Sequence, residues 1–117
     1  MTLGQLQRHF TLAFARLIIH AYDAGYEATM GDTYRDPRVF GKFGSKAKGA
    51  YGRKNSLHKY RLAADLNLFK DGEYLQESSD HLPLGEWWEA EYAVFNASSG
   101  TRFNDGNHYS FAYQGFR

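Results

Sequence analysis

The 117-residue chain contains no cysteine. This absence excludes a disulfide scaffold and a thiolate zinc site, so any transition metal must be held by His, Asp or Glu. The formal net charge is only +1, and a charge this close to zero gives no global electrostatic reason to bind nucleic acid or an anionic membrane. We therefore expect no nucleic-acid partner and no membrane insertion.

Long hydrophobic runs are also missing, and none approaches the roughly 18 apolar residues that a membrane span needs. The apolar residues near the N-terminus are interrupted by Arg8, His9 and Arg16, which is not the pattern of a signal peptide. The length suits one domain with a single core. We expect a cytoplasmic protein with one domain, residues 1–117.

The first helix is expected over residues 3–24, because its apolar side chains recur at steps of three or four and Gly25 can end it. These apolar positions are Leu6, Phe10, Phe14, Leu17 and Ala21. A short extended run, 26–31, follows. A second short helix could start at Pro37. Residues 41–53 contain four glycines and four Lys or Arg side chains, which favours a surface loop; the Walker order that a phosphate-binding loop requires is absent.

Residues 61–69 alternate in polarity as a strand does. The leucines fall on one face, and Asp65 and Asn67 fall on the other, which directs Asp65 towards a cleft or solvent. Asp71-Gly72 predicts a hairpin turn, and 73–75 the short returning strand.

The second half of the sequence predicts one more helix and one more strand. The helix covers 84–95, carries Trp87 and Trp88 on a broad aromatic side, and has Ser79 or Asp80 as candidate caps. Residues 97–100 are expected to form a loop and 104–106 a turn. The strand covers 108–113, with His108, Ser110 and Ala112 on its small-residue face.

Two imidazoles and a carboxylate are candidate metal ligands: His58, Asp65 and His108. The spacing of seven between the first two matches no helical pair, so spacing alone does not separate a metal site from ordinary surface residues. His81 is an alternative third ligand. His9 and His20 fall on the first helix, where polar-face or boundary positions are the simpler interpretation.

Two short motifs resemble those of the M15 family of zinc peptidases. The first is Ser56-Leu57-His58 followed by Asp65, with a small residue two positions before the aspartate; the second is Asp105-Gly106-Asn107-His108. That family contains D-alanyl-D-alanine carboxypeptidases and the L-alanyl-D-glutamate endopeptidases of phage endolysins. The resemblance spans roughly 24–113. It implies an α+β fold similar to the M15 and hedgehog-like peptidases, in which helices flank a small antiparallel sheet that carries a zinc site.

The resemblance also implies roles for individual residues. It makes Zn²⁺ the cofactor, with His58, Asp65 and His108 as its ligands. Asp105 corresponds to the catalytic acid/base and Arg35, in Thr-Tyr-Arg-Asp-Pro, to the arginine that steadies the scissile carbonyl oxygen. Ser56 corresponds to a residue that touches substrate.

Three positions depart from the family pattern. Arg61 stands where glycine is frequent, and Asn107 replaces an aromatic residue often found before the last histidine. Asp105 replaces the glutamate of the dipeptidases, which brings the chain closer to the endolysin branch.

The expected function is hydrolysis of the L-alanyl-D-glutamate bond in peptidoglycan stem peptides. A monomeric phage or prophage endolysin, released to the wall by a holin, would fit this activity. A D-alanyl-D-alanine carboxypeptidase is the alternative within the family. A non-catalytic wall-binding or structural zinc domain is the alternative from another class, and a nucleic-acid module based on the basic loop 42–54 is a third.

Overall fold

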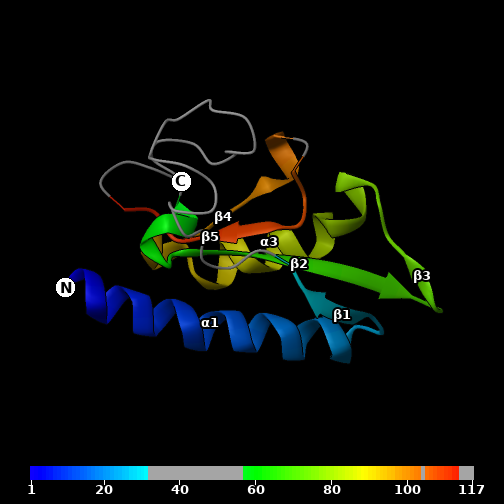
Figure 1. Cartoon of the computed structure of the whole chain (residues 1–117), viewed down its shortest axis with the longest axis horizontal. Coiled ribbons are helices and arrows are strands. Elements are labelled where there is room, and N and C mark those ends of the chain that lie inside the picture. Colours follow the sequence, from blue (N-terminus) through cyan, green and yellow to red (C-terminus); the bar gives the residue numbers. More distant parts are fainter. Residues whose placement is uncertain (32–56, 104, 114–117) are drawn as a thin grey trace.

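The computed structural model describes residues 1–31, 57–103 and 105–113. In this part of the chain, two α-helices pack with one five-stranded antiparallel sheet, which makes a small α+β domain (Figure 1). The helices are α1, Leu3–Asp23, and α3, Leu82–Glu91. The coarse fold class predicted from the sequence is therefore confirmed.

Helix α1 forms where the sequence predicts it. A capping box starts it: the Thr2 hydroxyl accepts a hydrogen bond from the Gln5 backbone N–H, and the Gln5 side chain accepts one from the Thr2 backbone N–H. The helix ends before Gly25, whose φ of 96° suits glycine. Its buried stripe, which faces the sheet, consists of Phe10, Ala13, Phe14, Leu17 and Ala21.

The sheet has the strand order β1-β2-β5-β4, and β3 also pairs with β2. Strand β2 is the longest and forms its centre, with Figure 1 showing α1 running along it. Every strand pairing in the described part of the chain is antiparallel. The strand bounds are β1, Glu27–Met30; β2, Ala63–Lys70; β3, Glu73–Tyr74; β4, Ser98–Ser99; and β5, His108–Ser110.

Several local predictions need correction. Helix α3 begins at Leu82 and ends at Glu91, after which Ala93–Phe95 forms a 3₁₀ turn. It is therefore shorter at its C-terminal end than the predicted 84–95. Neither Ser79 nor Asp80 caps it, because both lie inside a preceding 3₁₀ helix, Ser78–His81.

Three of the strand predictions were also partly wrong. Residues 98–99, predicted as loop, form β4 because they pair with β5. Strand β5 ends at Ser110 rather than at residue 113. Strand β2 starts at Ala63, two residues later than predicted.

The core lies between the two helices and one face of the sheet. Trp88 of α3 is fully buried. Its ring contacts Phe10 of α1 edge-on at 5.8 Å, Tyr109 of β5 at 5.9 Å and Phe111 at 5.3 Å. Its indole Nε1–H donates a hydrogen bond to the Ser110 backbone carbonyl at 3.2 Å. Trp88 therefore joins both helices to the strand that carries His108.

We expect Trp88→Ala to destabilise the protein by about 3–5 kcal/mol, because it leaves a large cavity in a close-packed core. The replacement also leaves the Ser110 carbonyl without its indole donor. Urea unfolding followed by circular dichroism measures the change. The matched control is Val94→Ala, since Val94 is 83% exposed and its truncation should change the free energy of unfolding by less than about 0.5 kcal/mol.

Within the part of the chain that the structure describes, neither helix has the length and apolar character needed to cross a membrane.

Candidate metal centre

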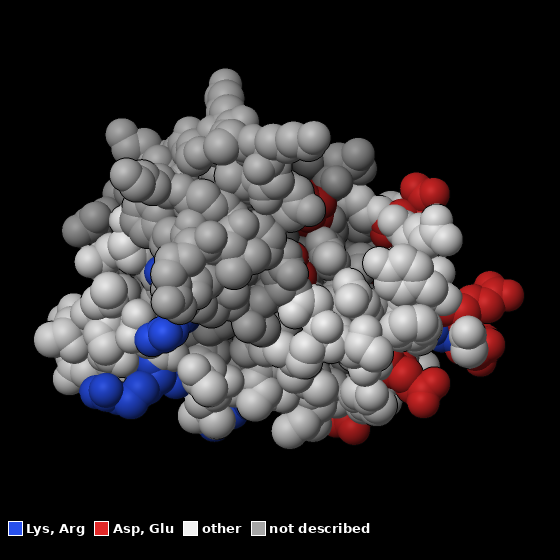
Figure 2. Space-filling view, viewed as in Figure 1, with Lys and Arg blue, Asp and Glu red and all other residues white. Residues whose placement is uncertain are grey.

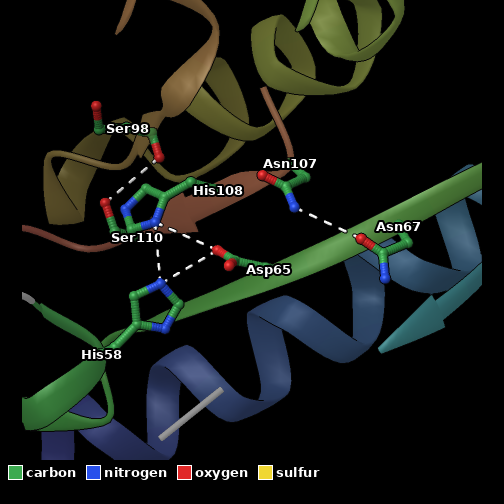
Figure 3. A network of polar contacts seen from close by, with 7 residues as sticks. All are labelled: His58, Asp65, Asn67, Ser98, Asn107, His108 and Ser110. Carbon is green, nitrogen blue, oxygen red and sulfur yellow. Dashed lines mark hydrogen bonds and ion pairs between the residues drawn. The ribbon is translucent and has the colours of Figure 1, made fainter. Parts of the chain in front are cut away.

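The first candidate ligand, His58, lies in a short 3₁₀ helix, Leu57–Tyr60, that leads into β2. The chain then turns through Arg61, which has a φ of 58°. This is the left-handed region that glycine adopts without cost and that other residues adopt rarely. Arg61, the position at which the sequence resemblance led us to expect glycine, therefore holds a backbone conformation that glycine adopts more readily. The turn returns the chain so that His58 faces the strand that follows it (Figure 3).

Asp65 and His108 are direct partners across the β2–β5 ladder. Residues directly opposite each other in an antiparallel pair project from the same face of the sheet. Their neighbours Ala64 and Tyr109 are also paired and are buried on the helix-covered face. Asp65 and His108 therefore project from the face opposite the helices, as the strand alternation predicted.

The three side chains converge on one another (Figure 3). The Nε2 atom of His58 lies 3.2 Å from the Nδ1 atom of His108. The Oδ1 atom of Asp65 lies 3.1 Å from the first nitrogen and 3.5 Å from the second. A tetrahedral zinc ion with bonds of about 2.0–2.1 Å would place its ligand atoms about 3.3–3.4 Å apart. The three observed separations bracket that distance, so this group could hold a metal ion.

The carboxylate supports the same interpretation. Asp65 is only 9% exposed, and its Oδ1 atom is buried without a hydrogen bond of good geometry, although two ring nitrogens lie within 3.5 Å. A buried carboxylate oxygen needs a partner. Burial alone raises the pKa of this carboxyl, but the close imidazoles of His108 and His58 outweigh it and lower the pKa to about 2. The carboxylate is thus ionised near neutral pH, as a metal ligand must be.

Asp105 lies on the turn that leads into β5. Its backbone carbonyl accepts a hydrogen bond from the His108 N–H at 3.1 Å, and its own N–H donates to the Gly100 carbonyl at 2.9 Å. A Cβ atom on Gly100 would overlap the Asp105 carbonyl, and one on Gly106 would lie 2.5 Å from the Ser78 carbonyl. The close approaches at Gly100 and Gly106 therefore fix this turn. The Asp105 residue itself is exposed.

Other predictions fall outside the described residues. These are the roles of Arg35 and Ser56, the short helix at Pro37 and the basic loop 42–54.

The remaining histidines do not join the group. His81 is 3% exposed, and its Nδ1 atom lies 3.0 Å from the Tyr109 hydroxyl. His20 stacks on Trp87 at 4.2 Å, and His9 lies 5.3 Å from the Phe95 ring. Among the described residues, the group that could hold a metal ion consists of His58, Asp65 and His108.

His81 should make the protein less stable as the solution is acidified. Its burial lowers its pKa below 6.5, and the negative charges of Asp80 and Asp105 only partly oppose this. The unfolded chain then binds the proton more readily, so stability is complete above about pH 6.5 and falls as the pH drops towards the folded-state pKa. Urea unfolding between pH 7.5 and 5 should show a steeper loss for the wild type than for His81→Gln. The two proteins share all their other histidines, so an equal dependence of the unfolding free energy on pH would contradict this assignment.

Sequence reasoning gave no role to Asn67, although strand alternation placed it on the same face as Asp65. Figure 3 shows its amide pointing towards Asn107, which lies next to His108. The signal was present in the two-residue spacing, but a single asparagine on a strand has no motif to mark it.

No protein-family model and no curated protein matches the sequence.

Proposed function

We propose that the protein is a zinc-dependent peptidase that cleaves peptidoglycan stem peptides at the L-alanyl-D-glutamate bond, as in the endolysin branch of the M15 family. The observation that carries the proposal is the convergence of His58, Asp65 and His108, with ligand atoms 3.1–3.5 Å apart. Two imidazoles and one carboxylate match the composition of known catalytic zinc sites, which have three protein ligands and keep an open position. Structural zinc sites more often use four protein ligands.

Zinc held by these residues would act as a Lewis acid and lower the pKa of a water molecule from about 15.7 to about 7. The chain itself supplies the other groups. Asp105 would accept the proton of the attacking water and deliver it to the leaving amine. Arg35 would donate hydrogen bonds to the oxyanion of the tetrahedral intermediate, and Ser56 would contact the substrate.

The position of Asp105 supports its part in this proposal. It lies three residues before His108, and the hydrogen bond between their backbones holds both on one turn. The aspartate at this position also favours the endolysin branch over the dipeptidases. We therefore propose a monomeric lysis enzyme of a phage or prophage, made in the host cytoplasm and brought to the wall with a holin.

Digestion of purified Gram-negative peptidoglycan tests the scissile bond directly. The zinc-loaded protein should release peptides with a new D-glutamate amino terminus, detected by mass spectrometry. Loss of single D-alanine residues would assign the carboxypeptidase reaction instead. Zinc binding and zinc-dependent stability without any new fragment would contradict the peptidase and favour a non-catalytic zinc domain.

A further inference from the structure

Two amide side chains extend the polar face of the sheet beyond the candidate metal centre. Asn67 lies two residues after Asp65 on β2, so it projects from the same face, and Asn107 directly precedes His108. The Asn107 Nδ2 atom donates to the Asn67 Oδ1 atom across 3.5 Å (Figure 3). The Asn67 Nδ2 atom in turn lies 3.4 Å from the Thr29 hydroxyl on β1. Asn67 and Asn107 are called the amide pair below.

The main chain next to the amide pair carries no side chain. Gly31 follows β1, and its N–H donates to the Asp65 carbonyl at 2.9 Å. A Cβ atom at this glycine would lie 3.0 Å from Asp65 Cβ and 3.4 Å from Asn67 Oδ1. Any larger residue would therefore crowd the surface between the carboxylate ligand and the amide pair.

The amide pair keeps much of its hydrogen-bonding capacity. Its two hydrogen-bonding contacts among the described residues, at 3.5 and 3.4 Å, lie beyond the usual range for N–H···O bonds. Each asparagine amide has two donors and an acceptor with two lone pairs, and the described residues give the Asn107 Oδ1 atom no partner. Both residues are half-buried. These groups suit a ligand that offers a donor and an acceptor together.

The charge of the surface near the amide pair indicates which class of ligand the pair would bind. Acidic side chains gather over the end of the molecule that carries β3 (Figures 1 and 2). Strand β2 runs from Asp65 through Asn67 towards its pairing with β3. Asp71, Glu73 and Glu77 in this region are exposed. Neutral amides beside an acidic surface favour an uncharged peptide group over a carboxylate.

We propose that Asn67 and Asn107 form a substrate subsite that binds a main-chain peptide group of the stem peptide next to the cleaved bond. The peptide C=O would accept from one asparagine N–H, and its N–H would donate to an asparagine oxygen. This inference rests on the proposed peptidase function. It assigns a role to Asn107, the position at which the chain departs from the family's aromatic residue.

The kinetic test uses near-isosteric replacements, Asn67→Leu and Asn107→Leu, with soluble stem peptides as substrates. Each variant loses neutral hydrogen bonds of about 0.5–1.5 kcal/mol, so KM should rise about 3- to 10-fold. Because these bonds form in both the ground and transition states, kcat should change little. Zinc affinity should stay at the wild-type value. The matched control is Gln76→Met, which replaces an exposed amide elsewhere, and its KM should not change.

A binding measurement on the wild type keeps the test independent of turnover and of variant folding. The side-chain amide resonances of Asn67 and Asn107 should shift when the stem peptide is titrated into zinc-loaded protein, whereas that of Gln76 should not. In a protein that hydrolyses the stem peptide, unshifted resonances or unchanged KM values would overturn the subsite and leave the peptidase intact. Shifted resonances without hydrolysis would support the subsite and contradict the peptidase. Neither binding nor hydrolysis would contradict both.

Discussion

His108→Ala is expected to abolish specific zinc binding. The replacement removes one of three ligands and leaves two side chains from a single segment, His58 and Asp65. At zinc concentrations about 100 times the wild-type dissociation constant, the bound ion should stabilise the wild type by about 2.7 kcal/mol. The variant should lose this increment. Calorimetric titration and thermal unfolding with and without zinc measure both effects.

The control for this experiment is His9→Ala, which removes an exposed imidazole on α1. It should bind zinc as the wild type does. Metal-free His108→Ala must first show a folded circular dichroism spectrum, so that lost binding is not lost structure. Zinc affinity within twofold of the wild type in His108→Ala would eliminate the three-residue centre.

Asp105→Asn is expected to keep zinc but lose most of its turnover. The amide retains the size of the carboxylate but cannot accept a proton, and general acid–base catalysis typically contributes about 10²- to 10⁴-fold. The loss should therefore appear in kcat at saturating substrate. Rates of stem-peptide hydrolysis, together with bound zinc per protein, measure the two properties separately.

Glu73→Gln provides the matched control, because it makes the same chemical change at an exposed position on β3. Its kcat should equal that of the wild type. If Asp105→Asn retained full turnover, Asp105 would have no part in proton transfer. If it lost zinc as well, its role would be to support His108 on their shared turn.

Local patterns predicted the two strands that carry Asp65 and His108, but not the 3₁₀ helix that carries His58. The apolar spacing of α1 and the alternation of β2 are strong because each repeats over several turns or residue pairs. The alternation also gave the correct face for Asp65. The alternation of residues 108–113 placed His108 at the start of a strand, where it lies.

Pairing between distant segments accounts for what the sequence did not predict. Ser98 and Ser99 have little strand propensity, and they form β4 because β5 offers a partner. The contact of Asp65 with His108 likewise depends on the β2–β5 register, which no local pattern contains. Helix α3 stops at Glu91 although its aromatic pattern continues, and the chain turns through Asn96 with a φ of 50°. The family resemblance could group His58, Asp65 and His108 as one predicted site, but only the fold gives the distances between their side chains.

Zinc titration of peptidoglycan hydrolysis tests the central claim most directly. Protein stripped of metal with a chelator, and then freed of the chelator, should release no stem-peptide amino groups from purified peptidoglycan. Hydrolysis should return in proportion to added zinc and reach its maximum at one ion per chain. Hydrolysis that persists in verified metal-free protein would contradict a zinc peptidase centred on His58, Asp65 and His108. A folded protein that binds one zinc ion and still releases no amino groups would contradict the proposed activity.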